Sequence, residues 1–442
     1  MAKRRAARHR TLLRLGCSLL AVPALVSLSG CAAARLKGDF RGYESAYAES
    51  ANRQMLLNLA RLEQHHPTYF LKLGQISTGY KFTANMGNAI SQSERPQSGA
   101  WTGTPGLGFE KTPQFTFIPV NDDQLADRLL KPVPADFFYA LYQQGWRVDQ
   151  LFRLMVDRIE MRKSGGTSVE VFRNVPTEDN KEGFATFLRV SAIAYELQQR
   201  GLLILDGQKR FVPYAQGWQR KELPETKDLW EAQGRRAVWT RTESGVWELG
   251  QEKLHAVFRL NLPAQSEEKR AQELVRYEKM VAAAAPELDQ AESLKNTLRV
   301  LVNGFAIQET AEGNKVERGD GPESCHLVMR SLISLMAAAA QEQAPFDELM
   351  QDPAFRKLIP SREQQPILRL RWQLPEAQLV PPLARVDYAR NIYLVSDEKS
   401  ARALKADSWN RDVFRLISQL ASQVTVDISK FPLPEILQIR TN

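Results

Sequence analysis

The stretch ADFFYALYQQGWRVDQLFRLMVDRI, residues 135–159, contains two apolar clusters at helical spacing. Gly145-Trp146 separates them and makes the turn. The pattern therefore predicts two consecutive helices within a helical region. The first cluster consists of Phe137, Phe138, Leu141 and Tyr142, and the second of Leu151, Phe152, Leu154, Met155 and Ile159.

Towards the N-terminus, the sequence predicts a helix followed by a β-hairpin. Apolar residues approximate one helical face from Gly42 to about His65, and Pro67 ends the helix. Two strands are expected at Tyr69–Thr83 and Pro113–Val120, so the hairpin spans residues 69–120. Its Gly-rich loop, residues 85–112, contains Trp101 and has a length typical of a functional or a disordered segment.

Towards the C-terminus, helices alternate with strands. A helix is predicted at Lys181–Arg200, closed by Gly201, and a charged helix ends near Ala285. The C-terminal part suggests a loose duplication, because two strand and helix combinations share a Leu/Ile-rich pattern. The predicted strands are Leu202–Leu205, Ala237–Thr242, Val246–Leu249, Leu254–Leu262, Thr297–Ile307, Ile367–Leu374 and Val386–Val395, and the last two helices are Ser324–Ala340 and Trp409–Ser422.

This order predicts an α+β fold. A helical N-terminal region with a long β-hairpin is followed by mixed α/β units with antiparallel strands. We expect a signal peptide at 1–30, a helical domain with the hairpin at 31–206, a β-rich region with a charged helix at 207–290, and an α+β region at 291–442. The last region is expected to hold two related strand and helix units.

The first thirty residues have the pattern of a secretory signal. A basic start without acidic residues, Met1 to Arg10, precedes a short apolar run from Leu15 to Leu28. The four residues at the end of this pattern, Leu28-Ser29-Gly30-Cys31, resemble the lipobox of bacterial lipoproteins. The resemblance implies cleavage before Cys31 and lipidation of that residue, which would attach the chain stably to a membrane.

The residue after the cysteine indicates which membrane would hold the chain. Ala32 stands where many inner-membrane lipoproteins have an aspartate. In a bacterium with two membranes, the resemblance therefore implies a lipid anchor in the outer membrane with the protein at the periplasmic face.

The net charge gives no support for a nucleic-acid partner. The formal charge is +8, but the predicted signal peptide holds six basic and no acidic residues, so +8 minus six leaves +2 for the remaining chain. A nucleic-acid-binding domain would show a clustered basic face. With 43% hydrophobic and 25% charged residues, the composition is that of an ordinary globular protein.

Motifs for catalysis, metal binding and cofactor binding are absent from the sequence. Cys325-His326 suggests a nucleophile, but the following apolar residues keep helical spacing, which favours a core cysteine at a helix start. Ser266 and Lys269 fit a Ser-x-x-Lys nucleophile pattern, but they open a highly charged helix, where Ser266 with a nearby Glu suits a helix cap. His65-His66 suits a helix end. We therefore predict no catalytic residue, no metal and no cofactor.

Several segments resemble an uncharacterised group of proteobacterial outer-membrane lipoproteins. The resemblance covers roughly residues 31–160 and implies the compartment, with no activity or catalytic residue attached. The segments are residues 52–61 (NRQMLLNLAR), 67–71 (PTYFL), 113–119 (PQFTFIP), 132–134, 145–146 and 151–159 (LFRLMVDRI), with a fainter similarity at 329–333.

Three functions are consistent with the sequence. The first is a non-enzymatic outer-membrane lipoprotein that acts as an accessory or scaffold in an envelope assembly, with a protein partner or self-association. The second is a ring-forming export lipoprotein whose hairpin 69–120 builds a pore, since membrane strands need only about 9–11 alternating residues. The third is a hydrolase of the cell envelope, which would need two carboxylates facing each other.

Overall fold

The computed structural model describes residues 41–86, 105–119, 128–162, 169–214, 219–234, 237–242, 244–262, 266–284, 295, 297–298, 300–301, 304–308, 324–399 and 408–425. The lipobox at residues 28–31 and most of the predicted loop 85–112 lie outside this part of the chain.

The protein has an α+β fold built on an eight-stranded sheet, as the sequence predicts. The order along the sheet is β4-β3-β10-β9-β8-β5, and β6 and β7 also pair with β8. Its pairs are antiparallel except β9 and β10, which run parallel. The strands are β3 (Val156–Arg162), β4 (Val169–Arg173), β5 (Leu203–Pro213), β6 (Gln219–Arg220), β7 (Val238–Arg241), β8 (Trp247–Leu260), β9 (Phe305–Gln308) and β10 (Ser324–Met329).

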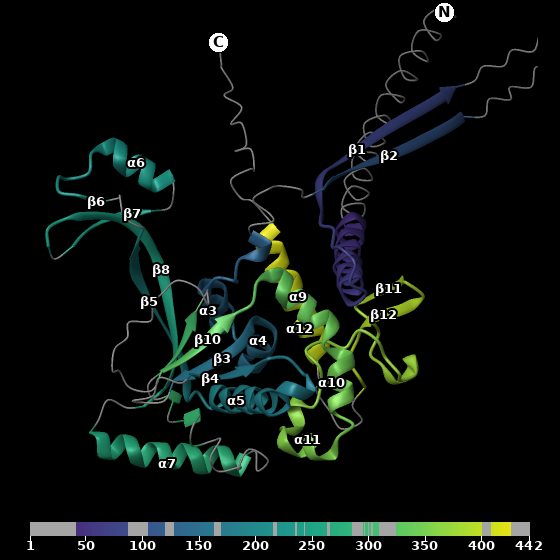
Figure 1. The fold of residues 1–442 in the computed structure, drawn as a ribbon. Helices are drawn as coiled ribbons and strands as arrows, with labels where there is room; N and C mark the ends of the chain where they lie inside the picture. The colour runs from purple at the N-terminus through teal and green to yellow at the C-terminus, as the bar shows by residue number, and fades with distance from the viewer. Residues whose placement is uncertain are drawn as a thin grey trace, which may run out of the picture.

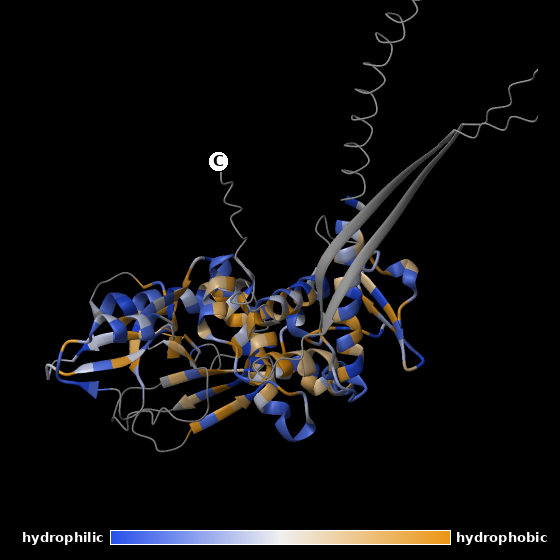
Figure 2. Ribbon diagram, turned by 90° about the horizontal axis from the view of Figure 1, so that it is seen from above, coloured by the Kyte–Doolittle hydropathy of each residue, from blue (hydrophilic) through white to orange (hydrophobic). Residues whose placement is uncertain are grey.

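Helices α3, α4 and α5 contact the strands of this sheet, and α9 and α12 contact α4 in turn (Figure 1). Apolar segments gather in the middle of the body, whereas the lobe around α6 is largely polar (Figure 2). The helices are α3 (Ala135–Gln143), α4 (Val148–Met155), α5 (Lys181–Gln199), α6 (Thr226–Gly234), α7 (Glu267–Ala284), α9 (Leu332–Gln341), α10 (Gln343–Leu349), α11 (Pro353–Leu358) and α12 (Trp409–Thr425), with short 3-10 turns η1 (Glu178–Asn180), η3 (Ser361–Glu363) and η4 (Glu376–Gln378).

The hydrophobic core is continuous across much of the chain. One buried cluster joins Leu56 of the N-terminal helix, Phe152 of α4, Phe258 of β8 and Phe414 of α12. The Phe258 ring lies in edge-to-face contact with Phe152, with ring centroids 5.6 Å apart. Elements far apart in sequence are therefore held by one set of apolar contacts.

The N-terminal helix covers residues 41–63 and is followed by the predicted hairpin. Strands β1 (Leu71–Met86) and β2 (Pro105–Pro119) pair antiparallel from Leu71 opposite Pro119 to Met86 opposite Pro105. The hairpin stands away from the body (Figure 1). The second strand begins eight residues earlier than the sequence pattern indicates, so residues 105–112 belong to β2 and not to the loop.

The second predicted helix at 151–159 is partly wrong. Helix α4 ends at Met155, and β3 begins at Val156 without a glycine or proline between them. Two buried side chains complete the hydrogen bonds of the helix end: Asn174 Nδ2 donates to the carbonyl oxygens of Arg153 and Val156, at 2.8 and 2.9 Å, and Arg330 Nη1 donates to that of Arg153 at 3.0 Å. These distant groups make the abrupt change from helix to strand possible.

Two predicted strands in the middle of the chain are also corrected. Leu254–Leu262 is not a third strand, because β8 runs without a break from Trp247 to Leu260. Gly250 permits this, since a Cβ there would lie 2.3 Å from the Val212 carbonyl oxygen of β5. The predicted strand Thr297–Ile307 is helical at 297–298 and 300–301. Gly304, with φ of +99°, ends this helix before β9.

The C-terminal predictions need three corrections. Residues 324–329 form strand β10, and the predicted helix starts only at Leu332 after the Ser331 cap. Residues 367–374 form no strand; there, the Gln343 side chain accepts hydrogen bonds from the Leu370 and Arg371 amides. The predicted strand Val386–Val395 is a hairpin of β11 (Ala384–Tyr388) and β12 (Asn391–Val395).

Three predicted helices and one predicted turn agree with the structure. Helices α5, α7 and α12 and the β7–β8 turn lie where the sequence indicates, and Gly201 follows α5 with φ of +66°. The two proposed strand and helix units differ in pairing, because β10 belongs to the large sheet and β11–β12 form a separate one. The domain boundaries at 206/207 and 290/291 stay predictions.

Candidate functional site

The base of the β1–β2 hairpin is fixed by one buried amide. Asn58 on the N-terminal helix is 1% exposed, and its Nδ2 donates to the Tyr69 carbonyl oxygen at 2.8 Å. Its Oδ1 accepts from the Tyr69 amide at 3.0 Å. The side chain thus pairs with the backbone as a neighbouring strand would, two residues before β1 begins. We call residues 58–70 the hairpin root.

The helix end is fixed to the C-terminal part of the chain by a polar cluster. Glu63 accepts a hydrogen bond from the Tyr393 hydroxyl at 2.8 Å and pairs with Arg371 at 2.9 Å. Burial, followed by the Glu63 carboxylate, raises the pKa of Tyr393. Gln341 of α9 donates to the Leu62 carbonyl oxygen at 2.8 Å. The hairpin root is therefore connected to both α9 and β12.

The two predicted helix-end histidines lie in this root. Helix 41–63 stops four residues before Pro67, because His65 takes a left-handed conformation with φ of +57°. His66 places Nδ1 2.6 Å from the Tyr388 hydroxyl of β11. The sequence placed these residues at a helix end correctly, but gave no sign of the contact with Tyr388.

A groove of about 780 Å³ lies beside the root. It is bounded by one side of helix 41–63, by Tyr69 and by Val386 of β11. The Arg61 guanidinium lies over the Tyr69 ring, 4.9 Å from its centroid, and 6.0 Å from that of Tyr388. The lining residues are Ala46, Glu49, Ser50, Arg53, Gln54, Leu57, Arg61, Tyr69 and Val386.

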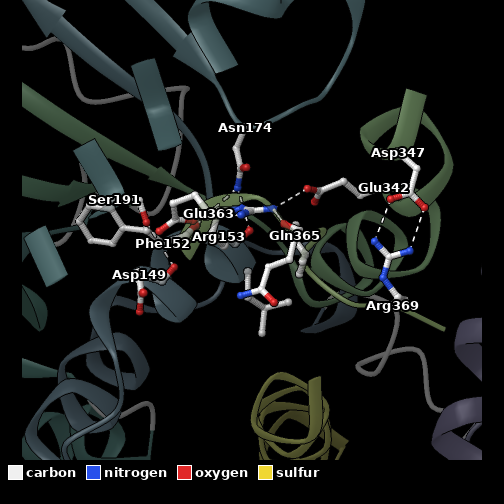
Figure 3. Close-up of polar contacts among 12 residues, drawn as sticks. Asp149, Phe152, Arg153, Asn174, Ser191, Glu342, Asp347, Glu363, Gln365 and Arg369 are labelled. Atoms are coloured by element: carbon white, nitrogen blue, oxygen red, sulfur yellow. Dashed lines mark hydrogen bonds and ion pairs between the residues drawn. The ribbon is translucent and has the colours of Figure 1, made fainter. Parts of the chain in front are cut away.

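A second charged centre lies inside the body (Figure 3). Arg153 of α4 is fully buried and joins two buried carboxylates, with Nη2 2.7 Å from Glu342 and Nη1 3.0 Å from Glu363. Its Nη2 also donates to the Gln365 carbonyl oxygen at 3.0 Å. One guanidinium thus ties α4 to the α9–α10 junction and to η3.

The carboxylates of this centre are harder to ionise than usual. Burial raises the pKa of Glu363 to about 7, against the attraction of Arg153, and the nearby Asp149 carboxylate raises it further. Burial also raises the pKa of Glu342. Because both carboxylates are buried in the core around a shared arginine, we assign them to holding the fold together.

The sequence-derived candidates are placed as follows. Cys31, with Leu28, Ser29 and Gly30, lies outside the described residues. Cys325 is buried in β10, where burial raises the pKa of its thiol well above the usual value, so it is a core residue in a strand and not at a helix start. Ser266 precedes α7 and its carbonyl oxygen accepts from the Arg270 amide, as expected at a helix start.

The described part of the chain can be searched for metal sites and for membrane-spanning helices. Within it, no group of three or more His, Cys, Asp or Glu side chains is arranged to hold a metal ion. Among the same residues, no helix combines the length and apolar character needed to cross a bilayer. Burial, and then Arg210, Arg259 and His326, lower the pKa of His255 in β8.

Sequence reasoning missed the residues that build the root. Asn58, Glu63, Arg371 and Tyr393 are single polar residues in separate segments, and no motif links them. Comparisons with protein-family models, curated proteins and solved structures find no match to this chain.

Proposed function

We propose that the protein is a non-enzymatic lipoprotein of the outer membrane, facing the periplasm, that acts as a scaffold in an envelope assembly. In this proposal the β1–β2 hairpin is the arm that binds another chain of the assembly. The observation that carries it is the hairpin itself, a long two-stranded sheet that leaves the body (Figure 1).

The length and pairing of the hairpin support a docking role. Sixteen residues in β1 correspond to roughly 50 Å of extended chain. In the part of the chain that the structure describes, β1 and β2 pair only with each other, so each has an outer edge of free backbone groups. Such edges bind another chain readily by strand addition.

The root supports the same role by fixing the direction of the arm. A hairpin on a flexible tether would lose more conformational entropy on binding than one held at its base. Here, Asn58 binds both backbone groups of Tyr69, and Glu63 ties the helix end to Arg371 and Tyr393. The arm is therefore pre-organised relative to the body.

The proposed lipid anchor would precede the N-terminal helix, whose other end forms part of the hairpin root. The described part of the N-terminal helix starts at residue 41, ten residues after Cys31. Ten residues reach at most about 36 Å when fully extended. A lipid on Cys31 would thus tether the start of the described helix to the membrane, and the root at Asn58 lies about 26 Å further along the helix axis.

Self-association through the hairpins is the second candidate. Strands of 16 and 15 residues exceed the roughly 9–11 residues of a membrane strand. One hairpin cannot close its own edges in lipid, so this candidate requires several copies. The hydrolase candidate gains no support from the groove, because Glu49 is the one carboxylate among its described lining residues, where glycoside hydrolysis uses two.

The test shortens the arm and leaves the root intact. Lys81 and Glu110 are directly opposite, so a two-residue Asn-Gly turn can join them and remove residues 82–109. A matched control joins Asn85 to Gly106, another opposite pair, and keeps most of both strands. The readout is the mass of the full chain after extraction in mild detergent.

We expect the wild-type chain and the Asn85–Gly106 control to be extracted in a complex, and the Lys81–Glu110 variant to be extracted as a folded monomer. A complex containing several copies of this chain alone favours the ring, and one with another protein favours the scaffold. A wild-type monomer, or a complex that is the same in all three chains, would refute docking through the hairpin.

A further inference from the structure

The groove beside the hairpin root has the features of a ligand site. Its volume of about 780 Å³ is within the usual range for small-molecule sites. Ala46, Leu57, Tyr69 and Val386 provide apolar surface in its wall. A ligand with an apolar chain could therefore bury that chain here.

Two arginines line the half of the groove nearer the hairpin root. Arg53, Leu57 and Arg61 are spaced by four residues, so they share one face of the helix. The arginine Cα atoms are about 12 Å apart along the axis, and their long side chains can converge over Leu57. Arginine suits phosphate and carboxylate groups because its planar fork can donate two parallel hydrogen bonds.

Neither guanidinium is neutralised by an acid within the described residues. Arg53 has no ion pair or hydrogen bond there, and Arg61 makes one long hydrogen bond, 3.5 Å to Asn58 Oδ1, besides its contacts with the two tyrosine rings. Stacking on Tyr69 orders the Arg61 guanidinium before any ligand arrives. Among the described lining residues, Glu49 is the one carboxylate; it lies about three helical turns from Arg61 and one turn from Arg53, with which it forms no ion pair in the described part of the chain.

From this arrangement, we infer that the groove binds an anionic amphiphile, with its phosphate or carboxylate head at Arg53 and Arg61 and its apolar chain against Leu57, Tyr69 and Val386. Membrane phospholipids and free acidic amphiphiles share this chemistry. Because Tyr69 belongs to both the groove and the hairpin root, a bound ligand would contact the base of the arm. The inference concerns binding and does not depend on the role of the hairpin.

The test uses the full chain in nanodiscs of phosphatidylcholine, with hexyl phosphate as the probe. Inorganic phosphate and hexanol each lack one half of the expected ligand. Binding is measured by equilibrium dialysis for the wild type, Arg53→Gln, Arg61→Gln and Ala46→Trp, the last of which fills the groove. Arg41→Gln is the matched control, since Arg41 is exposed on the same helix and does not line the groove.

We expect hexyl phosphate to bind saturably with 1:1 stoichiometry. Its affinity should be about tenfold higher than that of inorganic phosphate or hexanol, in line with one added charged contact. Arg53→Gln, Arg61→Gln and Ala46→Trp should each weaken binding about tenfold or more, whereas Arg41→Gln should not change it. Absence of saturable binding, or equal loss in the Arg41→Gln control, would overturn the inference.

A second arm identifies the source of the ligand. A photoreactive phosphatidylglycerol is placed in the same nanodiscs, and labelled residues are located by mass spectrometry. Labelling of helix 41–63 on the groove side shows that a bilayer lipid occupies the site. Hexyl phosphate binding without such labelling shows that the ligand is a free amphiphile.

Discussion

Asn58 pairs with Tyr69 through both ends of its amide, at 2.8 and 3.0 Å, and so replaces a missing strand at the base of the β1–β2 hairpin. Asn58 is 1% exposed, and Leu56, Leu59 and Ala60 of the same helix are also buried. This contact joins the N-terminal helix to the hairpin as a single unit. It is the local interaction on which the proposed docking role depends most directly.

Replacing Asn58 by alanine should loosen the root. The change removes both hydrogen bonds to the Tyr69 backbone, each of which contributes about 0.5–1.5 kcal/mol. We expect faster hydrogen exchange at Tyr69 and the first residues of β1, together with a lower free energy of unfolding in denaturant. Asn52→Ala is the control, because Asn52 is half-buried on the same helix and makes no side-chain hydrogen bond in the described part of the chain. Equal exchange rates in the two variants would contradict this role for Asn58.

Replacing Arg153 by methionine should destabilise the body strongly. The variant leaves the Glu342 and Glu363 carboxylates buried without their shared cation. Breaking a buried ion pair on one side typically costs about 3–5 kcal/mol. The triple variant Arg153→Met, Glu342→Gln, Glu363→Gln removes the charges together and should recover most of this loss in a denaturant titration. A triple variant no more stable than Arg153→Met would show that packing, and not charge, explains the effect.

Glu363 should make the stability of the protein depend on pH in the direction opposite to that of a carboxylate whose pKa is lowered on folding. Its pKa of about 7 in the folded protein lies above its usual value of 4.5, so the folded state binds more protons between these pH values. The contribution of this group is therefore fully present below about pH 4.5 and is lost as the pH rises to 7. The free energy of unfolding is measured at pH 5 and at pH 7.5. We expect it to decrease less between these two pH values in Glu363→Gln than in the wild type. Parallel pH profiles would contradict the raised pKa.

Thiol counting tests the predicted lipidation of Cys31. The chain has three cysteines, of which Cys17 lies in the predicted signal peptide. Burial raises the pKa of Cys325 and shields its thiol. The processed, lipidated protein should therefore show no reactive thiol when native and one after unfolding. A reactive thiol in the native protein, or two or three after unfolding, would contradict processing and lipidation.

Local sequence signals predicted the elements whose ends they mark directly. Gly201 after α5 and the Glu-Ser-Gly turn before β8 supply the conformations that these ends require, and both are visible as residue types. The alternating pattern at 76–82 likewise indicated β1.

Elements whose ends depend on distant residues escaped prediction. The helical spacing of Phe152, Met155 and Ile159 concealed the change to β3, because Asn174 and Arg330 complete the hydrogen bonds of the helix end from other segments. The β11–β12 turn uses Ala389 and Arg390 at positive φ, where Asn-Gly would have given a signal. The root was missed for the same reason, since Glu63 and Tyr393 are 330 residues apart.

Site-specific photo-cross-linking along the hairpin is the most direct test of the docking role. A photoreactive amino acid is placed at Thr78 of β1 or Gln114 of β2 in cells that produce the full chain, and at Val275 of α7, which is 50% exposed, as the control. We predict a discrete adduct from both hairpin positions and none from Val275, with its mass identifying a partner or a second copy of this chain. Adducts from Val275 alone, or from none of the three positions, would contradict docking through the hairpin.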